Sequence, residues 1–510
     1  MIDMSRYSRA AMAGVIGFLG VSCGAPATVA RPAGPAASPI TSIAPIARGI
    51  DESIGLARDP RIVAAIADID PARVRRTDSA LVSFGTRNTF SDTLSATRGI
   101  GAARRWIHAQ LDGYSRDCGG CLRVEYYGKI NEFHPRRGDS TTISANVVDV
   151  VAWLPGRDTS RVIVITGHYD SCICSLGGTY DSTSTAPGAD DDGSGTSAIV
   201  ELARVFSKRF PKGLDATIIF AAVAAEEQGL NGSRQLAERL HDGGYTVVAG
   251  MTDDIVGNVT AEDGTTDSTS MRIFAADPDN SPSRELGRYV WALDRVYLPG
   301  FDVLPVWRLD RIGRGGDHEP YVNLGDAGLR FTERLENYNR QHLPTDDFAH
   351  VNFGYVANVA RVNAITVGSL AAAPATPANA RAARQSRAAD SSGASSGGQA
   401  WTLSWEPSAG ATSYELLIRS TTAATWERVI PLGNVTRCTL RRQLDDEWAG
   451  VRAVGVDGAR SMAASMPAPR LPPGVARGRG AAGGPGAAPP AAGRGRGGQP
   501  AGPPPPVCGS

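Results

Sequence analysis

The chain contains little cysteine, and its positive and negative charges are equal in number. Seven cysteines among 510 residues are too few for a small disulfide-stapled fold. Lysine plus arginine and aspartate plus glutamate number 52 each, so the net charge gives no sign of a nucleic-acid partner. Aromatic residues make up only 6%, but a hydrophobic content of 42% over this length can support a sizeable core and more than one domain.

The N-terminal apolar run, AAMAGVIGFLGVS, is too short to span a membrane and favours an export signal over 1–23. LGVSC resembles the processing box of bacterial lipoproteins, with Gly20 where that pattern usually has leucine. If Cys23 is lipidated, the mature protein is a membrane-anchored lipoprotein of the periplasm or cell envelope. If cleavage falls a few residues later, the protein is secreted. A linker rich in proline and alanine, 24–48, argues against a buried N-terminal helix.

Four cysteines occur in close pairs. Cys118 and Cys121 form a CxxC, and Cys172 and Cys174 form a CxC. A zinc site with four thiolates is conceivable, but CxC is an awkward spacing for tetrahedral zinc and export implies an oxidising compartment. We therefore expect disulfides, and the pairing stays open.

Strand-like and helix-like runs alternate from residue 122 to residue 373. The runs 162–167 and 216–224 are apolar and β-rich, whereas 195–209 has helical spacing. Such alternation predicts an α/β domain over 49–373, with a mostly parallel sheet and helices on both faces.

The composition changes after this domain. We expect a linker over 374–399, because that stretch is rich in alanine, serine and glycine. Short alternating segments over 400–470 predict a small antiparallel sandwich, and WTLSWEP followed by SYELLIRS resembles a fibronectin type III module. The remainder, 471–510, is rich in glycine, proline and arginine and predicts disorder.

Three polar motifs gather around the predicted parallel strands. His168 follows VIVITG, Glu226 and Glu227 follow IIFAAVAA, and the run Asp190 to Asp192 precedes a helix. Ligands bind at the carboxyl ends of such strands. One aspartate is explained as a helix cap, but three consecutive carboxylates repel one another unless a cation intervenes. The two glutamates point to opposite sides, so one can bind a metal while the other faces the water beside it.

The order HYDS, GADDDGSG, AAEEQGL resembles the zinc-dependent aminopeptidase family, which also contains glutamate carboxypeptidases and, more distantly, glutaminyl cyclases. The resemblance extends over about residues 95–370. It implies that His168 binds one zinc, Asp191 bridges two, Glu226 is the general base and Glu227 binds the other zinc.

Two further ligands are implied downstream. MTDDIVGN resembles a family element that makes Asp254 share a zinc with His168, with Asp253 as an adjacent competitor. In NRQHLPTDDF the H-x-P-x-D pattern makes His342 share a zinc with Glu227. His318, in GDHEPY, lies in a segment similar to a loop near the family's site and is not expected to be a ligand.

The implied cofactor is two Zn²⁺, for which Co²⁺ or Mn²⁺ could substitute because the ligands are oxygen and nitrogen. Glu226 would take a proton from the attacking water and deliver it to the departing amine. Asp170, two residues after His168, is predicted to orient that imidazole, and Asp346 to do the same for His342.

These patterns predict an exported, zinc-dependent exopeptidase acting on peptides, with aminopeptidase as the first expectation. A carboxypeptidase is the closest alternative, because the same metal site serves both reactions. A glutaminyl cyclase is disfavoured, because such relatives use one zinc and lack the ADDDGSG pattern. An inactive binding module is also disfavoured, because no expected ligand is missing.

Overall fold

The computed structural model describes residues 54–135, 141–385, 400–467 and 505–508. In the N-terminal domain the elements are α1 (Pro60–Ala67), α2 (Pro71–Ser83), α3 (Gly99–Asp117), β1 (Arg123–Phe133), β2 (Ile143–Leu154), β3 (Asp158–His168), η1 (Cys174–Leu176), η2 (Ala189–Ser194), α4 (Gly195–Arg209), β4 (Ala216–Val223), α5 (Asn231–Asp242), β5 (Thr246–Asp253), β6 (Ser270–Ala275), α6 (Pro282–Tyr297), β7 (Asp302–Val306), α7 (Glu319–Leu324), β8 (Gly328–Glu333), η3 (Phe348–His350) and α8 (Phe353–Ala372). The predicted export signal, Cys23 and the first linker lie outside the described residues.

The strands of this domain form one sheet in the order β1-β2-β4-β3-β5-β8-β6-β7. The four central strands, β4, β3, β5 and β8, are parallel to one another. Antiparallel pairs lie toward both edges, where β1 pairs with β2, β2 with β4, and β6 with β8. The predicted α/β class with a mostly parallel centre is therefore confirmed.

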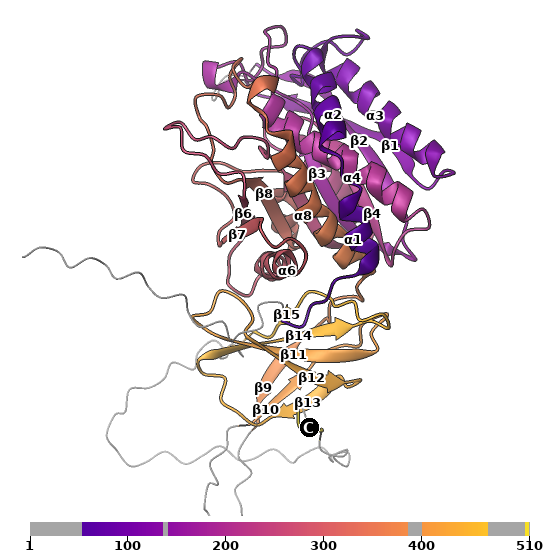
Figure 1. The fold of residues 1–510 in the computed structure, drawn as a ribbon, viewed down its shortest axis with the longest axis vertical. Helices are drawn as coiled ribbons and strands as arrows, with labels where there is room; N and C mark the ends of the chain where they lie inside the picture. The colour runs from indigo at the N-terminus through magenta and orange to yellow at the C-terminus, as the bar shows by residue number, and fades with distance from the viewer. Residues whose placement is uncertain (1–53, 136–140, 386–399, 468–504, 509–510) are drawn as a thin grey trace, which may run out of the picture. The chain divides into compact units, whose positions relative to one another are not determined.

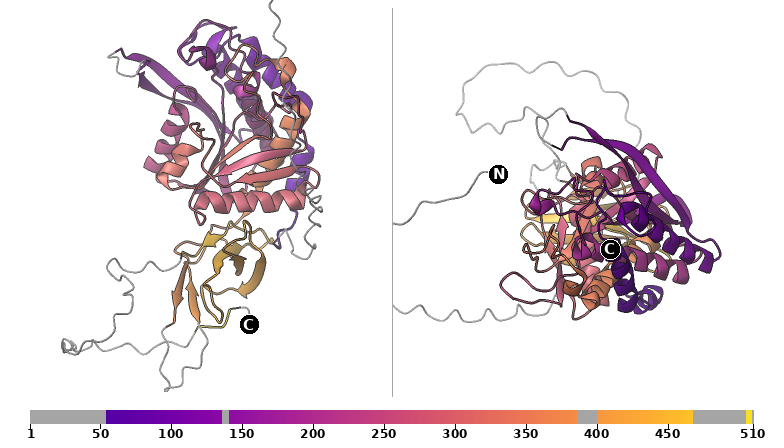
Figure 2. Two further views of the ribbon diagram at one scale, coloured as in Figure 1. Left: turned by 90° about the vertical axis from the view of Figure 1, so that its left-hand side faces the viewer. Right: turned by 90° about the horizontal axis from the view of Figure 1, so that it is seen from above.

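Helices cover both faces of the sheet (Figure 1, Figure 2). Along β4, Ile218 and Phe220 belong to the larger core, which also contains residues of α3, α4 and α8. Ile219 points to the opposite side and packs with Leu236 of α5 and Tyr321 of α7. Because both faces are covered, every residue of β4 is buried, which accounts for its continuous apolar sequence.

Three short elements are not predicted by the sequence pattern: β6, β7 and α7. Their lengths of six, five and six residues give little periodicity to detect. Pro305 lies in β7, which is an edge strand, where the missing N–H of proline is tolerated. The loop from β7 to α7 reaches the functional site described below.

The C-terminal module has two antiparallel sheets, ordered β13-β10-β9 and β12-β11-β14-β15. Its strands are β9 (Arg381–Arg384), β10 (Trp401–Ser404), β11 (Ser413–Ser420), β12 (Arg428–Gly433), β13 (Arg437–Leu440), β14 (Glu447–Val454) and β15 (Ala464–Ser465). Leu403 of one sheet and Leu416 and Val451 of the other share one core, as in a sandwich.

The predicted boundaries of this module need correction. β9 lies inside the expected linker 374–399, yet it pairs with β10. Cys508, in the stretch expected to be disordered, forms a disulfide with Cys438 of β13. Neither strand pairing nor disulfide connectivity across a long gap can be deduced from one sequence.

The module packs against α6 through buried polar contacts. Glu285 accepts hydrogen bonds from Trp426 Nε1 at 2.9 Å, from Ser465 Oγ at 2.6 Å and from Arg288 Nη1 at 2.7 Å. Arg288 Nε also donates to the carbonyl oxygen of Ala424 at 2.8 Å. The two parts of the chain therefore share an interior.

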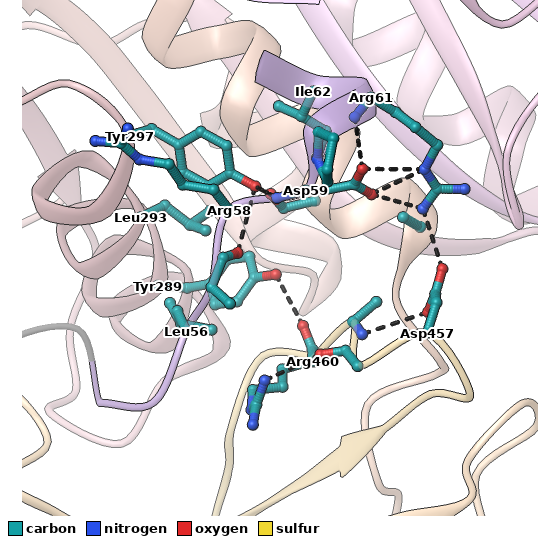
Figure 3. A pocket seen from close by; sticks show the side chains of 16 residues that line it. Leu56, Arg58, Asp59, Arg61, Ile62, Tyr289, Leu293, Tyr297, Asp457 and Arg460 are labelled. Atoms are coloured by element: carbon teal, nitrogen blue, oxygen red, sulfur yellow. Dashed lines mark hydrogen bonds and ion pairs between the residues drawn. The ribbon is translucent and has the colours of Figure 1, made fainter. Parts of the chain in front are cut away.

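A pocket of about 440 Å³ lies beside this interface, between α6 and the turn 457–460 (Figure 3). Arg61 forms an ion pair with Asp457 at 3.0 Å, and Tyr289 Oη donates to the carbonyl oxygen of Arg460 at 2.8 Å. Within the described ranges, no helix combines the length and the apolarity that a membrane crossing needs.

Candidate metal centre

The predicted ligands converge at the carboxyl ends of the parallel strands. His168 is the last residue of β3, and Asp254 directly follows β5. Glu227 follows β4 after a short turn, and Asp191 lies in η2, just before α4. His342 lies on the long connection between β8 and η3. Neighbouring parallel strands thus bring together residues that are far apart in the sequence.

Asp191 stands between the two histidines. Its Oδ1 lies 3.1 Å from His168 Nε2, and its Oδ2 lies 3.0 Å from His342 Nε2. Asp254 Oδ1 lies 3.9 Å from His168 Nε2, and Glu227 Oε2 lies 3.3 Å from His342 Nε2. The five side chains thus form two groups of three that share Asp191, each with its ligand atoms within 4.8 Å of one another.

Asp254 rather than its neighbour Asp253 belongs to this cluster. Asp253 Oδ2 accepts a hydrogen bond from the Asn363 amide of α8. Burial raises the pKa of Asp253 to about 8. The positions of the two aspartates agree with the expected choice of Asp254, and metal binding by Asp254 stays a prediction.

The cluster fits a pair of zinc ions. His168 Nε2 and Glu227 Oε1 are buried and have no hydrogen-bond partner of good geometry among the described residues. Burial and neighbouring carboxylates raise the pKa of Glu227 well above its usual range, which shows how costly its charge is without a cation. Carboxylate oxygens and imidazole nitrogens are ligands that zinc accepts. The positions agree with the predicted ligand set, and metal binding by these residues stays a prediction.

Asp170 contacts His168, as predicted, and also holds the glutamate pair. His168 Nδ1 lies 3.5 Å from Asp170 Oδ1 and 3.2 Å from its carbonyl oxygen. The Asp170 carboxylate accepts the backbone N–H of Glu226 at 3.2 Å and that of Glu227 at 3.4 Å. One side chain therefore orients groups on β3 and on the turn after β4.

The predicted role of Asp346 is wrong. Its two carboxylate oxygens accept the backbone N–H groups of Asp190 and Asp191, each at 2.9 Å. Asp346 therefore fixes the turn that carries Asp191 and makes no hydrogen bond to the His342 ring among the described contacts. The sequence interval of four residues between His342 and Asp346 suggests proximity, but the Asp346 carboxylate is occupied by the backbone of the turn 190–191.

Positive backbone φ angles mark the turns that present the site. Ala225, just before Glu226, has φ 56°, and Ile255, just after Asp254, has φ 51°. Residues with a Cβ seldom adopt this left-handed conformation, and tertiary contacts must hold it. The backbone N–H of Asn231 bonds the Ala225 carbonyl at 3.0 Å, and that of Glu333 bonds the Ile255 carbonyl at 2.9 Å.

Glu226 belongs to neither group of three and lines the cavity above them. This cavity measures about 310 Å³. Burial raises the pKa of Glu226 well above its usual range. A general base must reach the reacting atoms without being a metal ligand, and Glu226 lines the cavity outside both groups of three.

Three arginines that were not predicted from the sequence line the cavity: Arg311, Arg314 and Arg330. Arg330 Nη2 lies 2.9 Å from Asp254 Oδ1 and fixes that carboxylate. No sequence motif marks it, since it lies within the ordinary strand β8. His318, which was not expected to be a ligand, lies outside the cluster, with Nε2 2.9 Å from the carbonyl oxygen of Leu309.

The expected disulfides are confirmed. Cys118 pairs with Cys121 and Cys172 pairs with Cys174, so these residues form no four-thiolate zinc site. Cys174 Sγ lies 3.8 Å from Glu227 Oε2, at the border of the metal cluster.

Comparison with known proteins identifies the family. A model of peptidase family M28 matches residues 149–367, a range that contains all five predicted ligands. A probable zinc metalloprotease of Pyricularia oryzae is 36% identical over 447 residues, covering 81% of this chain and 85% of that protein. This chain belongs to peptidase family M28. The resemblance of its motifs to zinc-dependent peptidases is confirmed at the level of the family.

A second relative and a solved structure are also similar to this M28 peptidase. A probable zinc metalloprotease of Leptosphaeria maculans is 36% identical over 443 residues, covering 80% of this chain and 98% of that protein. LapB from Legionella pneumophila, a solved structure, is 23% identical, covers 62% of this chain and 77% of that one, and has a TM-score of 0.48. That last likeness is too distant to bear on activity.

Proposed function

We propose that this M28 peptidase is a dinuclear zinc exopeptidase, with His168 and Asp254 on one ion, Glu227 and His342 on the other, and Asp191 between them. The observation that carries the proposal is the Asp191 carboxylate, which offers one oxygen to each histidine at 3.1 and 3.0 Å. A carboxylate shared by two groups of ligands is the arrangement that a two-metal hydrolase needs.

The chain's own residues supply the rest of the chemistry. Zinc, when bound, lowers the pKa of water and polarises the scissile carbonyl. Glu226 takes the proton of the attacking water and returns it to the departing amine, because it lines the cavity without belonging to either ligand group. Asp170 keeps Glu226 in place through the backbone N–H, and Arg330 holds Asp254. The peptide bond is cleaved, and the products are an amine and a carboxylate.

Exopeptidase activity fits the size of the cavity. A volume of about 310 Å³ is at the low end for ligand pockets and suits the end of a peptide better than its middle. An aminopeptidase is the first candidate, because the motifs that carry the predicted ligands resemble those of the zinc-dependent aminopeptidase family.

A carboxypeptidase is the second candidate, because Arg311 and Arg314 line the same cavity. A panel of short peptides with free or acetylated amines and free or amidated carboxyl ends separates the two. Cleavage that requires a free amine supports the aminopeptidase, and cleavage that requires a free carboxyl end supports the carboxypeptidase. Cleavage of doubly blocked peptides would contradict both.

We also propose that the protein is exported, as residues 1–23 imply. Expression of the full chain in a Gram-negative bacterium followed by N-terminal sequencing tests this. A mature chain that begins at or soon after Cys23 is expected, and an unprocessed cytosolic chain would contradict it.

A further inference from the structure

One wall of the cavity over the metal centre is cationic. Arg311 and Arg314 come from the loop between β7 and α7, and Arg330 comes from β8. The guanidinium of Arg330 already forms ion pairs with Asp254 at 2.9 Å and with Asp310 at 3.2 Å. Arg311 and Arg314 have N–H groups left to donate to a ligand.

Arg311 has one unused donor in a buried position. Its side chain is only 9% exposed, and Nε and Nη1 pair with Asp310 at 3.0 Å and with Glu336 at 2.6 Å. Its remaining nitrogen, Nη2, is buried without a hydrogen-bond partner among the described residues. A buried charged donor left unpaired is unfavourable. Because Arg311 also lines the cavity, a small movement of its side chain would let an acceptor there receive this strong hydrogen bond.

Arg314 carries a charge that no described carboxylate balances. It forms no salt bridge within the described part of the chain, and its Nη1 donates to the neutral Gln341 Oε1 at 3.3 Å. It is also partly exposed, so an incoming ligand can reach it. Two guanidinium groups on one short loop, each with free donors, match the planar shape of a carboxylate.

We propose that Arg311 and Arg314 bind a carboxylate of the peptide substrate and so determine which peptides this enzyme accepts. The inference rests on the proposed peptidase function of the cavity. Glu226, Glu227 and Asp191 line the same cavity, and the proposed function places the reacting bond beside them. The carboxylate therefore lies close to that bond. It is the C-terminal group of a short peptide or the side chain of an aspartate or glutamate.

Matched substrates distinguish these sources. Leucyl-alanine and its C-terminal amide differ in the α-carboxylate, whereas leucyl-glutamate amide and leucyl-glutamine amide differ in the side-chain carboxylate. The zinc-loaded full chain should prefer the acid of one pair by about 10- to 100-fold in kcat/KM, the loss expected for a charge-assisted hydrogen bond. The preferred pair identifies the source.

Arg314→Gln should abolish this preference by raising KM for the acid while leaving the neutral substrates unchanged, and Arg314→Lys should restore part of it. Arg308→Gln is the matched control, because Arg308 lies on the same loop but does not line the cavity. An equal preference in the parent and in Arg314→Gln would overturn the inference while leaving the proposed peptidase intact.

A binding measurement decides the inference even without turnover. The chelator-treated full chain is titrated in a calorimeter with two pairs of ligands. N-acetylalanine and its amide differ in the α-carboxylate, and N-acetylglutamate amide and N-acetylglutamine amide differ in the side-chain carboxylate. Binding of an acid that weakens at least fivefold in Arg314→Gln, with the thermal unfolding midpoint unchanged, supports the carboxylate site. Equal binding by both chains, or none, overturns it. Failure of every peptide to be hydrolysed would instead count against the proposed function.

Discussion

Asp191 Oδ2 lies 3.0 Å from His342 Nε2, although a long stretch of chain separates the two residues. The contact joins the turn before α4 to the connection after β8. It depends on the sheet order, which brings β3, β5 and β8 side by side. The cluster of predicted ligands is therefore a property of the whole sheet and cannot form from a local segment.

Replacing Glu226 by Gln should remove the base without removing a ligand. We expect zinc content close to that of the parent and a fall in kcat of about two to four orders of magnitude, the usual contribution of a general base. Atomic absorption and steady-state kinetics on the same preparation measure both. The matched control is Glu227→Gln, which should lose metal as well as activity. Near-parental turnover in Glu226→Gln would refute the assignment.

Replacing Asp346 by Asn should weaken metal binding indirectly. An asparagine side chain has one acceptor oxygen, so it can receive only one of the N–H groups of Asp190 and Asp191. The turn that carries Asp191 should then be less well fixed, and zinc affinity should fall about 10- to 100-fold. Competition with a chelating dye measures this. Asp347→Asn, at an exposed neighbouring position, should leave affinity unchanged, and an equal loss in both variants would contradict the role of Asp346.

His168 and Glu227 could be predicted because each follows a strand whose apolar pattern is plain, and Asp191 because it lies in an acidic run just before a helix. The roles of Asp254 and His342 as ligands were inferred from the resemblance to a family and not from the periodicity of the sequence. Arg311, Arg314 and Arg330 could not be predicted, because they become neighbours only when the loop after β7 meets β8. The part played by Asp346 could not be predicted, because the backbone N–H groups that it binds, those of Asp190 and Asp191, lie 156 and 155 residues away in the sequence.

Trp426→Phe should destabilise the chain without touching the cavity. The substitution keeps an aromatic ring but removes the Nε1–H that donates to the buried Glu285 at 2.9 Å. The free energy of unfolding should fall by about 1.5–3 kcal/mol, the cost of losing a hydrogen bond to a charged group. Trp405→Phe is the control, because Trp405 is also buried but its Nε1 has no partner among the described residues. Equal losses would show that ring size alone matters.

This interface also bears on the domain division. No pattern in the sequence indicates that Glu285 and Arg288 of α6 are buried by a module more than a hundred residues away. A chain ending at residue 373 would expose both side chains and the apolar surface around Ala292. We expect such a chain to unfold at a lower temperature than the full chain, as calorimetry would measure. An unchanged midpoint would show that the module is independent.

Glu336 should make stability depend on pH. Burial alone would raise the pKa of Glu336, but Arg311 and Arg272 lower it from 4.5 to about 2. Because the folded pKa is depressed, the stabilisation of about 3 kcal/mol is fully present above pH 4.5 and is lost as pH falls toward 2.

Glu336→Gln should therefore be destabilised by a similar amount at pH 7 and at pH 5. The difference from the parent should shrink by about 1 kcal/mol at pH 3.5, because the unfolded parent then binds a proton that the folded parent does not. Urea unfolding at these three pH values measures it. A difference that does not change with pH would contradict the ion pairs of Glu336 with Arg311 and Arg272.

The most direct test of the account is the number of zinc ions per folded chain. The purified full-length protein, equilibrated with zinc and freed of excess metal by gel filtration, is assayed by mass spectrometry of metals and by quantitative amino-acid analysis. The account predicts two zinc ions per chain in the parent and a loss of bound zinc in Asp191→Ala, since Asp191 serves both ions. A folded parent that binds one ion or none would contradict the dinuclear centre.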